Sequence, residues 1–160
     1  MQTVYERCCG IDVHKKLIVA CFRNGKKTEL RKYDTLTSSI KELAIWLIEN
    51  GCEMVAMEST GAYWKPIYNI LELLCLDVMV VNAHHMKNVP GRKTDAKDAE
   101  WIADLLQHGL LRGSYIPNKE QRELREVVRY RKSLIEERSR EINRLEKTLE
   151  GANIKLSSYV

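Results

Sequence analysis

Four acidic residues stand beside segments that a strand-and-helix pattern would bring together. Two lie at or near the ends of short apolar runs and two open a helical pattern: Asp12, Glu58, Asp95 and Asp98. A carboxylate at a buried strand end is costly unless it is paired or binds a metal, and four together would repel one another without cations. Hard divalent cations such as Mg²⁺ bind oxygen ligands, and paired metals suit phosphodiester chemistry. The four residues are therefore the candidate metal ligands and catalytic residues.

Each of the four also has an ordinary structural interpretation. Asp95 and Asp98 are spaced i,i+3 and would suit the first turn of any helix, where the helix dipole favours acids. Asp12 alone could end a strand, and Glu58 alone could cap the next helix. Their combination favours a site, because ligand sites in open α/β sheets gather at the carboxyl ends of strands.

The elements that must position these carboxylates follow from the apolar patterning. Strands are expected at residues 7–13, 16–23, 26–33, 53–58 and 77–81, and helices at 40–50, 63–74, 95–107 and 119–150. Asn24-Gly25 is a strong hairpin signal between the second and third strands. Helices that alternate with short apolar strands predict an α/β fold, a mixed five-stranded sheet covered on both faces. An RNase H-like sheet has this order of elements, as do other mixed α/β domains.

Local signals set the expected ends of the helices. Ser39 with Glu42 resembles a capping box for the first helix, and Gly51 is its expected stop. Asn118 with Gln121 resembles a cap for the last helix. Residues 113–117 are expected to be a short linker. In the helix before that linker, Glu100 and Asp104 are expected to be surface acids.

The last helix carries a seven-residue apolar repeat. One set of positions is Val128, Ile135, Ile142 and Leu149, and the complementary set is Leu124, Arg131, Arg138 and Leu145. A 3.5-residue period predicts a coiled coil or packing on a partner helix, although two central arginines weaken a dry seam. We therefore divide the chain into a domain at 1–114 and a helical segment at 115–160, through which a homo-oligomer is expected.

Composition is that of a soluble, mildly basic protein. The net charge is +4, 44% of residues are hydrophobic and 30% are charged, which is compatible with a nucleic-acid partner. No apolar stretch has membrane-spanning length and no signal-peptide pattern is present, so a cytoplasmic protein is expected. With a nucleic-acid partner, it would be nucleoid-associated. Five cysteines, an odd number without CxxC spacing, predict reduced core thiols and not a zinc site.

Several residues near the carboxylates are candidates for binding nucleic acid. Ser59 and Thr60 could present hydroxyls and N–H groups to a phosphate, or could simply cap a helix. Arg92 and Lys93 could hold a backbone phosphate because their basic loop adjoins the acidic residues, although a solvated loop is the alternative. Lys15 follows Asp12 closely and is included with them.

Three ordered motifs resemble those of a known family. They are Gly10-Ile11-Asp12-Val13-His14-Lys15, Met57-Glu58-Ser59-Thr60-Gly61 and Arg92-Lys93-Thr94-Asp95-Ala96-Lys97-Asp98-Ala99. The family is the insertion-sequence transposases with an N-terminal RuvC-like DEDD domain, related to the Piv and MooV site-specific DNA invertases. The resemblance spans nearly the whole chain, and the tract at 105–111 and Pro117 also fit it.

The resemblance implies an RNase H-like (RuvC-like) fold and a Mg²⁺- or Mn²⁺-dependent DNA transposase or recombinase, with Asp12, Glu58, Asp95 and Asp98 as the metal-binding tetrad. Family members continue into a C-terminal domain whose serine attacks DNA, so this chain alone is expected to be inactive in strand transfer. DNA is the implied partner, and a guide-type non-coding RNA is a further one.

Two other functions fit parts of the sequence. A non-catalytic nucleic-acid-binding and dimerisation module would use the basic loop and the arginines of the last helix. Salt-sensitive binding without Mg²⁺ would favour it. An ATP-handling protein with the related actin-like fold ranks last, because no glycine-rich nucleotide loop is visible.

Overall fold

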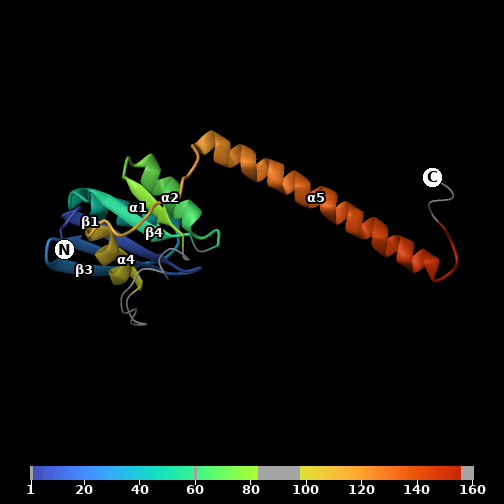
Figure 1. Ribbon diagram of the computed structural model, residues 1–160, viewed down its shortest axis with the longest axis horizontal. Helices are drawn as coiled ribbons and strands as arrows, with labels where there is room; N and C mark the ends of the chain where they lie inside the picture. The colour runs from blue at the N-terminus through green and yellow to red at the C-terminus, as the bar shows by residue number, and fades with distance from the viewer. Residues whose placement is uncertain (1, 60, 83–97, 156–160) are drawn as a thin grey trace. The chain divides into compact units, whose positions relative to one another are not determined.

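Five strands form one mixed sheet in the order β3-β2-β1-β4-β5. The structure is a computed structural model that describes residues 2–59, 61–82 and 98–155 (Figure 1). The strands are β1 (Arg7–Val13), β2 (Ile18–Asn24), β3 (Lys27–Tyr33), β4 (Met54–Glu58) and β5 (Val78–Val81). β1, β2 and β3 pair antiparallel, whereas β4 is parallel to β1 and β5 is parallel to β4. The predicted mixed five-stranded sheet is confirmed.

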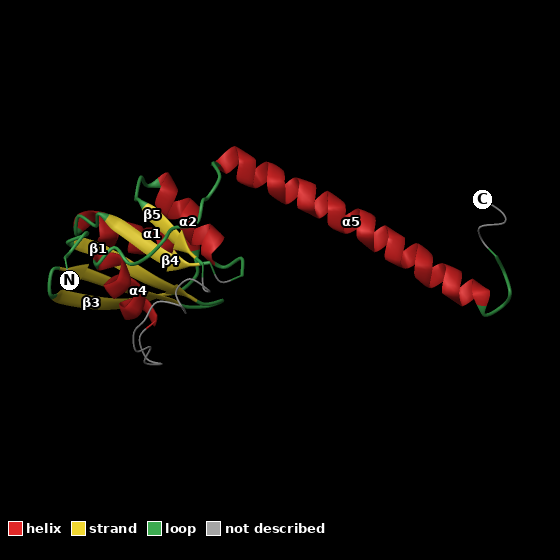
Figure 2. Cartoon of the chain, viewed as in Figure 1, coloured by secondary structure: helices red, strands yellow, loops and turns green. Residues whose placement is uncertain are grey.

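Helices cover both faces of this sheet (Figure 2). They are α1 (Thr37–Glu49), α2 (Trp64–Leu73) and α4 (Asp98–Gln107). Alternation along β2 assigns the faces, because neighbouring strand residues point to opposite sides. Phe22 packs edge-on against Trp46 of α1, with ring centroids 5.7 Å apart. Cys21, the preceding residue, packs with Ala99 and Ala103 of α4. α1 and α4 therefore lie on opposite faces.

The α4 helix runs antiparallel to β1 and lies unusually close to it. The carbonyl oxygen of Gln107, at its C-terminal end, accepts a hydrogen bond of 2.8 Å from Val4 N, just before β1. At the middle of β1, a Cβ added to Gly10 would lie 2.3 Å from Ala103 N and 2.4 Å from Ala99 O. Glycine inside a strand permits such a close backbone approach.

Of the two predicted ends of α1, the start is wrong and the stop is confirmed. α1 begins at Thr37 with Leu36 as its N-cap and has no side-chain cap, so the capping box expected at Ser39 and Glu42 does not form. The helix begins two residues before Ser39, which places that serine inside the first turn. Gly51 ends the helix with a φ of 63°, a left-handed conformation that glycine adopts without strain.

The segment after α4 is more ordered than the linker expected at 113–117. Gly113 forms an antiparallel bridge with Val81, and Ser114 N donates a 2.7 Å hydrogen bond to Val80 O. The chain thus adds a short pairing to β5 before it leaves the sheet.

Three of the five cysteines belong to the buried core. None of the five forms a disulfide; Cys8, Cys9 and Cys21 are buried. Burial raises the pKa of the Cys8 thiol to about 12 and that of the Cys9 thiol well above its ordinary value, because the thiolate would be poorly solvated. These thiols therefore stay protonated, as reduced core residues would.

The chain divides into two compact units, Met1–Tyr115 and Ile116–Val160. The second consists mainly of α5 (Lys119–Glu150), whose predicted N-cap is confirmed, because Gln121 N donates a 2.9 Å hydrogen bond to Asn118 Oδ1. No residue of α5 is buried. Over the described ranges, no helix combines the length and apolar character needed to cross a membrane.

Replacing Gly10 with alanine tests the contact between α4 and β1. The new methyl group would collide with backbone atoms of α4, which cannot rotate away as a side chain can. We expect Gly10→Ala to lower the free energy of unfolding by about 3 kcal/mol or more, measured by urea denaturation. Gly25→Ala is the control, because nothing lies within 4 Å of its added Cβ and its φ of 59° alone should cost about 1 kcal/mol. Equal losses in the two variants would contradict the close approach.

Candidate active site

Asp12 and Glu58 occupy neighbouring positions on adjacent parallel strands. The last paired position of β1 and β4 is Ile11 with Met57, so the next residues, Asp12 and Glu58, continue the same register. Both side chains belong to the α4 face, because Cys8 and Ala56, which alternate in phase with them, pack in one cluster with Ile102 of α4. The carboxylates thus end two adjacent strands on one face of the sheet.

Asp98 reaches the same end of the sheet from α4. Since α4 runs antiparallel to β1, its first residue lies toward the end of β1 that carries Asp12. The next residue, Ala99, packs with Val19, which pairs directly with Asp12 across β1 and β2. One carboxylate oxygen of Asp98 is shielded from solvent. Two strands and a helix therefore bring Asp12, Glu58 and Asp98 to one region.

His14 contacts the acidic site directly. Its Nε2 lies 2.9 Å from Oδ2 of Asp12, and the side chains are 59% and 18% exposed, respectively. The turn that holds His14 is closed by a 2.8 Å hydrogen bond from His14 N to Leu17 O. The histidine therefore presents an exposed ring beside a largely buried carboxylate.

The side chains of the described acids are not close enough together to bind a metal ion jointly. Within residues 2–59, 61–82 and 98–155, no three His, Cys, Asp or Glu side chains gather closely enough to hold a metal ion. Asp95, the fourth predicted ligand, lies outside the described residues. The fold brings the backbones of Asp12, Glu58 and Asp98 to the same end of the sheet.

The predicted nucleic-acid-binding residues fall partly within the described chain. Lys15 is exposed in the turn after β1, and its carbonyl oxygen accepts a 3.1 Å hydrogen bond from Thr35 Oγ1. Ser59 follows Glu58, and its N–H donates a 2.9 Å hydrogen bond to Val81 O. The remaining three, Thr60, Arg92 and Lys93, lie outside the described residues.

A polar cluster fixes the other end of α4. Arg23 Nη1 forms an ion pair with Asp104 and donates a 2.7 Å hydrogen bond to Gln107 Oε1. Gln107 is buried, and its Nε2 donates a 2.9 Å hydrogen bond to Gly25 O in the hairpin turn. The expectation that Asp104 is an ordinary surface acid was therefore wrong, because Arg23 emerges from β2 on the face that α4 covers.

Two residues that matter to this geometry were not singled out from the sequence, and the contact made by a third was not foreseen. Gly10 had a usable signal, because a glycine inside an apolar strand often marks a close backbone approach. Gln107 had none, since its partners are 82 and 84 residues away in the chain. His14 was expected to be a surface turn residue, with the orientation of a water or phosphate as the alternative, and the turn after β1 places its ring against Asp12.

A comparison with protein families identifies the family of the chain. The family model described as "Transposase", that of the IS110-type DEDD transposases, matches residues 9–154 and so spans almost the entire chain. The chain belongs to this transposase family. The matched region contains all four acidic residues and extends to the end of α5, and it confirms the resemblance to insertion-sequence transposases. No curated protein matches the chain.

Two solved structures resemble the fold at low sequence identity. One is RuvC of T. thermophilus in complex with a Holliday junction substrate, with 11% identity, 68% of this chain and 99% of that chain covered, and a TM-score of 0.46. The other is the Fowlpox virus resolvase with Holliday junction DNA, with 17% identity, coverage of 62% and 72%, and a TM-score of 0.38. The RNase H-like fold class predicted from the sequence is confirmed by the strand order and pairing described above.

Replacing Gln107 tests the polar cluster behind α4. Gln107→Leu keeps the side-chain volume but removes the hydrogen bonds to Gly25 O and from Arg23. We expect the free energy of unfolding to fall by about 1–3 kcal/mol, measured by urea denaturation, because partly buried polar groups lose their partners. The same change at exposed Gln2 should leave stability nearly unchanged. Wild-type stability of Gln107→Leu would contradict the role of this cluster.

Proposed function

We propose that the first unit of this transposase cleaves DNA phosphodiester bonds with Mg²⁺ or Mn²⁺ bound by Asp12, Glu58, Asp95 and Asp98. The observation that supports this most directly is the shared register and face of Asp12 and Glu58, with the start of α4 at the same end of the sheet. Membership of the transposase family supplies DNA as the substrate. The Holliday junction DNA bound by the two similar proteins accords with it.

The chemistry of the donor set fits a hard divalent cation. All the proposed ligands are carboxylates, and the two cations bind oxygen ligands preferentially. Asp12 is only 18% exposed and one oxygen of Asp98 is shielded, so bringing these charges together without a cation would be costly. The exclusively oxygen character of the site argues against zinc, which is bound in proteins mostly by sulfur and nitrogen.

Each described residue has a defined part in the proposed mechanism. Bound divalent metal would polarise the phosphoryl oxygen, activate the nucleophile and stabilise the leaving oxygen. Asp12 and Glu58 would bind from the sheet and Asp98 from α4, so that the close contact at Gly10 sets their separation. His14, 2.9 Å from Asp12 Oδ2, holds the orientation of that carboxylate.

The residues around the carboxylates would hold the DNA. Lys15 and Ser59 follow the ends of β1 and β4, where the two carboxylates stand, and are proposed to bind backbone phosphates together with Thr60, Arg92 and Lys93. Such contacts position DNA without selecting its sequence.

Metal titration of single carboxylate variants tests the proposal. In isothermal titration of Mn²⁺, Asp12→Asn and Asp98→Asn should each weaken binding at least about tenfold, because each removes a charged ligand. Asp77→Asn is the matched control, since this exposed acid lies before β5, at the opposite end of the parallel strands. Wild-type affinity in either site variant would remove that residue from the site.

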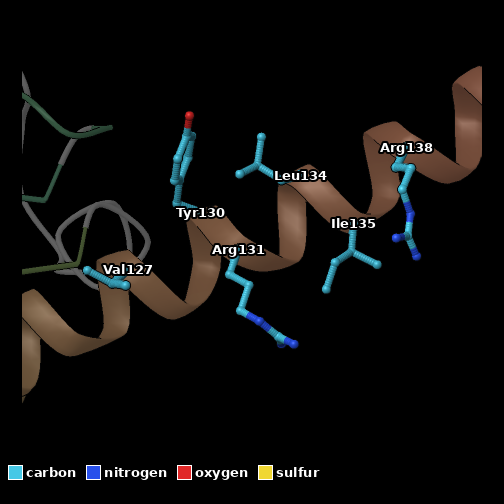
Figure 3. Close-up of a pocket in the computed structure, with 6 residues that line it drawn as sticks. All are labelled: Val127, Tyr130, Arg131, Leu134, Ile135 and Arg138. Atoms are coloured by element: carbon cyan, nitrogen blue, oxygen red, sulfur yellow. The ribbon is translucent and has the colours of Figure 1, made fainter.

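We also propose that α5 pairs with a second copy of the chain. Its seven-residue repeat leaves large apolar side chains in solvent, including Val128, Ile135 and Ile142, which are 57%, 41% and 46% exposed. Figure 3 shows Ile135 projecting from the same side of the helix as Arg131. Pairing would bury this row, as in coiled coils, while the arginines would keep their charges at its margin. The guide-type RNA stays a prediction from the family resemblance.

Sedimentation equilibrium tests the pairing of α5. Ile135→Lys places a charge in the apolar row and should raise the dimer dissociation constant at least about tenfold, since a buried unpaired charge is costly. Glu137→Lys introduces the same side chain outside the row and should leave association unchanged. A wild-type chain that stays monomeric at high concentration would contradict the proposal.

A further inference from the structure

The α4 face of the sheet carries a row of four residues that lie on four adjacent strands. Asp12 pairs with Val19 across β1 and β2, and Val19 pairs with Lys32 across β2 and β3. Glu58 continues the row on β4, one position beyond the last paired residues of β1 and β4. Directly paired residues point to the same face, so the row runs Glu58, Asp12, Val19, Lys32.

The packing of Val19 fixes which face this is. Val19 packs against the cluster of Cys21, Ala99 and Ala103, and the two alanines belong to α4. Lys32 is therefore on the side of the sheet that carries the acidic residues. It is exposed on β3, the edge strand, where its side chain reaches solvent.

On the opposite face of β3, the charged side chain of Arg31 is bound by neighbouring residues. Arg31 forms a 2.7 Å ion pair with Glu29, and its guanidinium lies 4.4 Å from the centre of the Trp46 ring. The guanidinium of Arg31 is therefore engaged by Glu29 and by Trp46 of α1, and it links the edge strand to that helix. Among the residues that the structure describes, Lys32 has no ion-pair partner, so its charge is available to a ligand on the α4 face.

Lysine at this position suits a nucleic-acid phosphate. With neighbouring strands about 4.8 Å apart, Lys32 lies roughly 10 Å from Asp12 along the row. A nucleic-acid strand carries one phosphate per about 3.4 Å of helix axis, so a strand with one phosphate at Asp12 would have another near Lys32 within a few nucleotides. Lys15 lies in the turn after β1, at the same end of the strand as Asp12, and its carbonyl oxygen accepts a hydrogen bond from Thr35 Oγ1.

We propose that Lys32 binds a backbone phosphate of the DNA strand whose scissile phosphate lies at the acidic site, so that this edge of the sheet sets how the DNA crosses the carboxylates. The inference rests on the proposed function, because it takes DNA as the substrate. It adds an attachment point on β3, whereas the other proposed phosphate ligands belong to segments that follow β1, β4 and β5.

Binding of a fluorescently labelled DNA duplex in EDTA tests the inference without the metal site. Lys32→Glu should weaken binding about tenfold at low salt and reduce the slope of log K against log salt by about 1, as loss of one phosphate contact predicts. Lys32→Gln should lie between it and the wild type. Lys27→Glu is the matched control: it makes the same charge change on the same strand, but Lys27 lies on the opposite face and at the other end of β3.

The outcomes separate this inference from the proposed function. Equal affinities for Lys32→Glu and Lys27→Glu would overturn the role of Lys32, even if the duplex binds and Mn²⁺ titrates normally. A wild-type chain that binds no duplex would overturn it together with DNA as the substrate. A loss confined to an RNA of the same sequence would overturn it in favour of an RNA partner. Unchanged thermal unfolding of the variants excludes misfolding as the cause of a loss.

Discussion

The close contact between α4 and β1 at Gly10 is the constraint on which the site depends. A helix normally rests on a sheet through side chains, but here the backbone of Ala99 and Ala103 comes within contact distance of the strand itself. Small residues on both sides make this possible. Because the proposed site is divided between the strand ends and the start of α4, the depth at which α4 sits decides how near Asp98 comes to Asp12 and Glu58.

The rest of the first unit holds that contact in place. At the far end of α4, Gln107 and Asp104 bind Arg23 of β2, and the Gln107 side chain also holds the hairpin turn at Gly25. Between the two ends, Ile102, Leu105 and Leu106 pack on the sheet with Cys8 and Ala56. A slide of α4 along β1 would break the polar cluster and the apolar packing together. The helix is therefore held at both ends and in the middle. The proposed site requires this, because its carboxylates come from both the sheet and α4.

The charges of this unit are distributed as the proposed binding of DNA through divalent cations requires. The acids end strands at the middle of the sheet, where Asp12 is largely shielded, whereas lysines occupy the exposed turn and edge strand beside them. A bare acidic surface would repel DNA; flanking lysines offset that repulsion and attract the backbone. The row from Glu58 to Lys32 places both kinds of charge on a single face.

The sequence by itself determined the elements, because each has a local signature: apolar runs for the strands, Asn24-Gly25 for the hairpin, Gly51 for a helix end and Asn118 for a helix start. It also determined the family, through motifs whose residues lie close together in the chain. The capping pattern at Ser39 and Glu42 did not set the start of α1, which begins earlier, at Thr37. Only the tertiary structure decided the depth of α4, the contact of His14 with Asp12, the partners of Gln107 and the face of Lys32. Each depends on strand register or on helix packing between distant segments. Of the four, only the depth of α4 has a local signal, the glycine at position 10 inside an apolar strand.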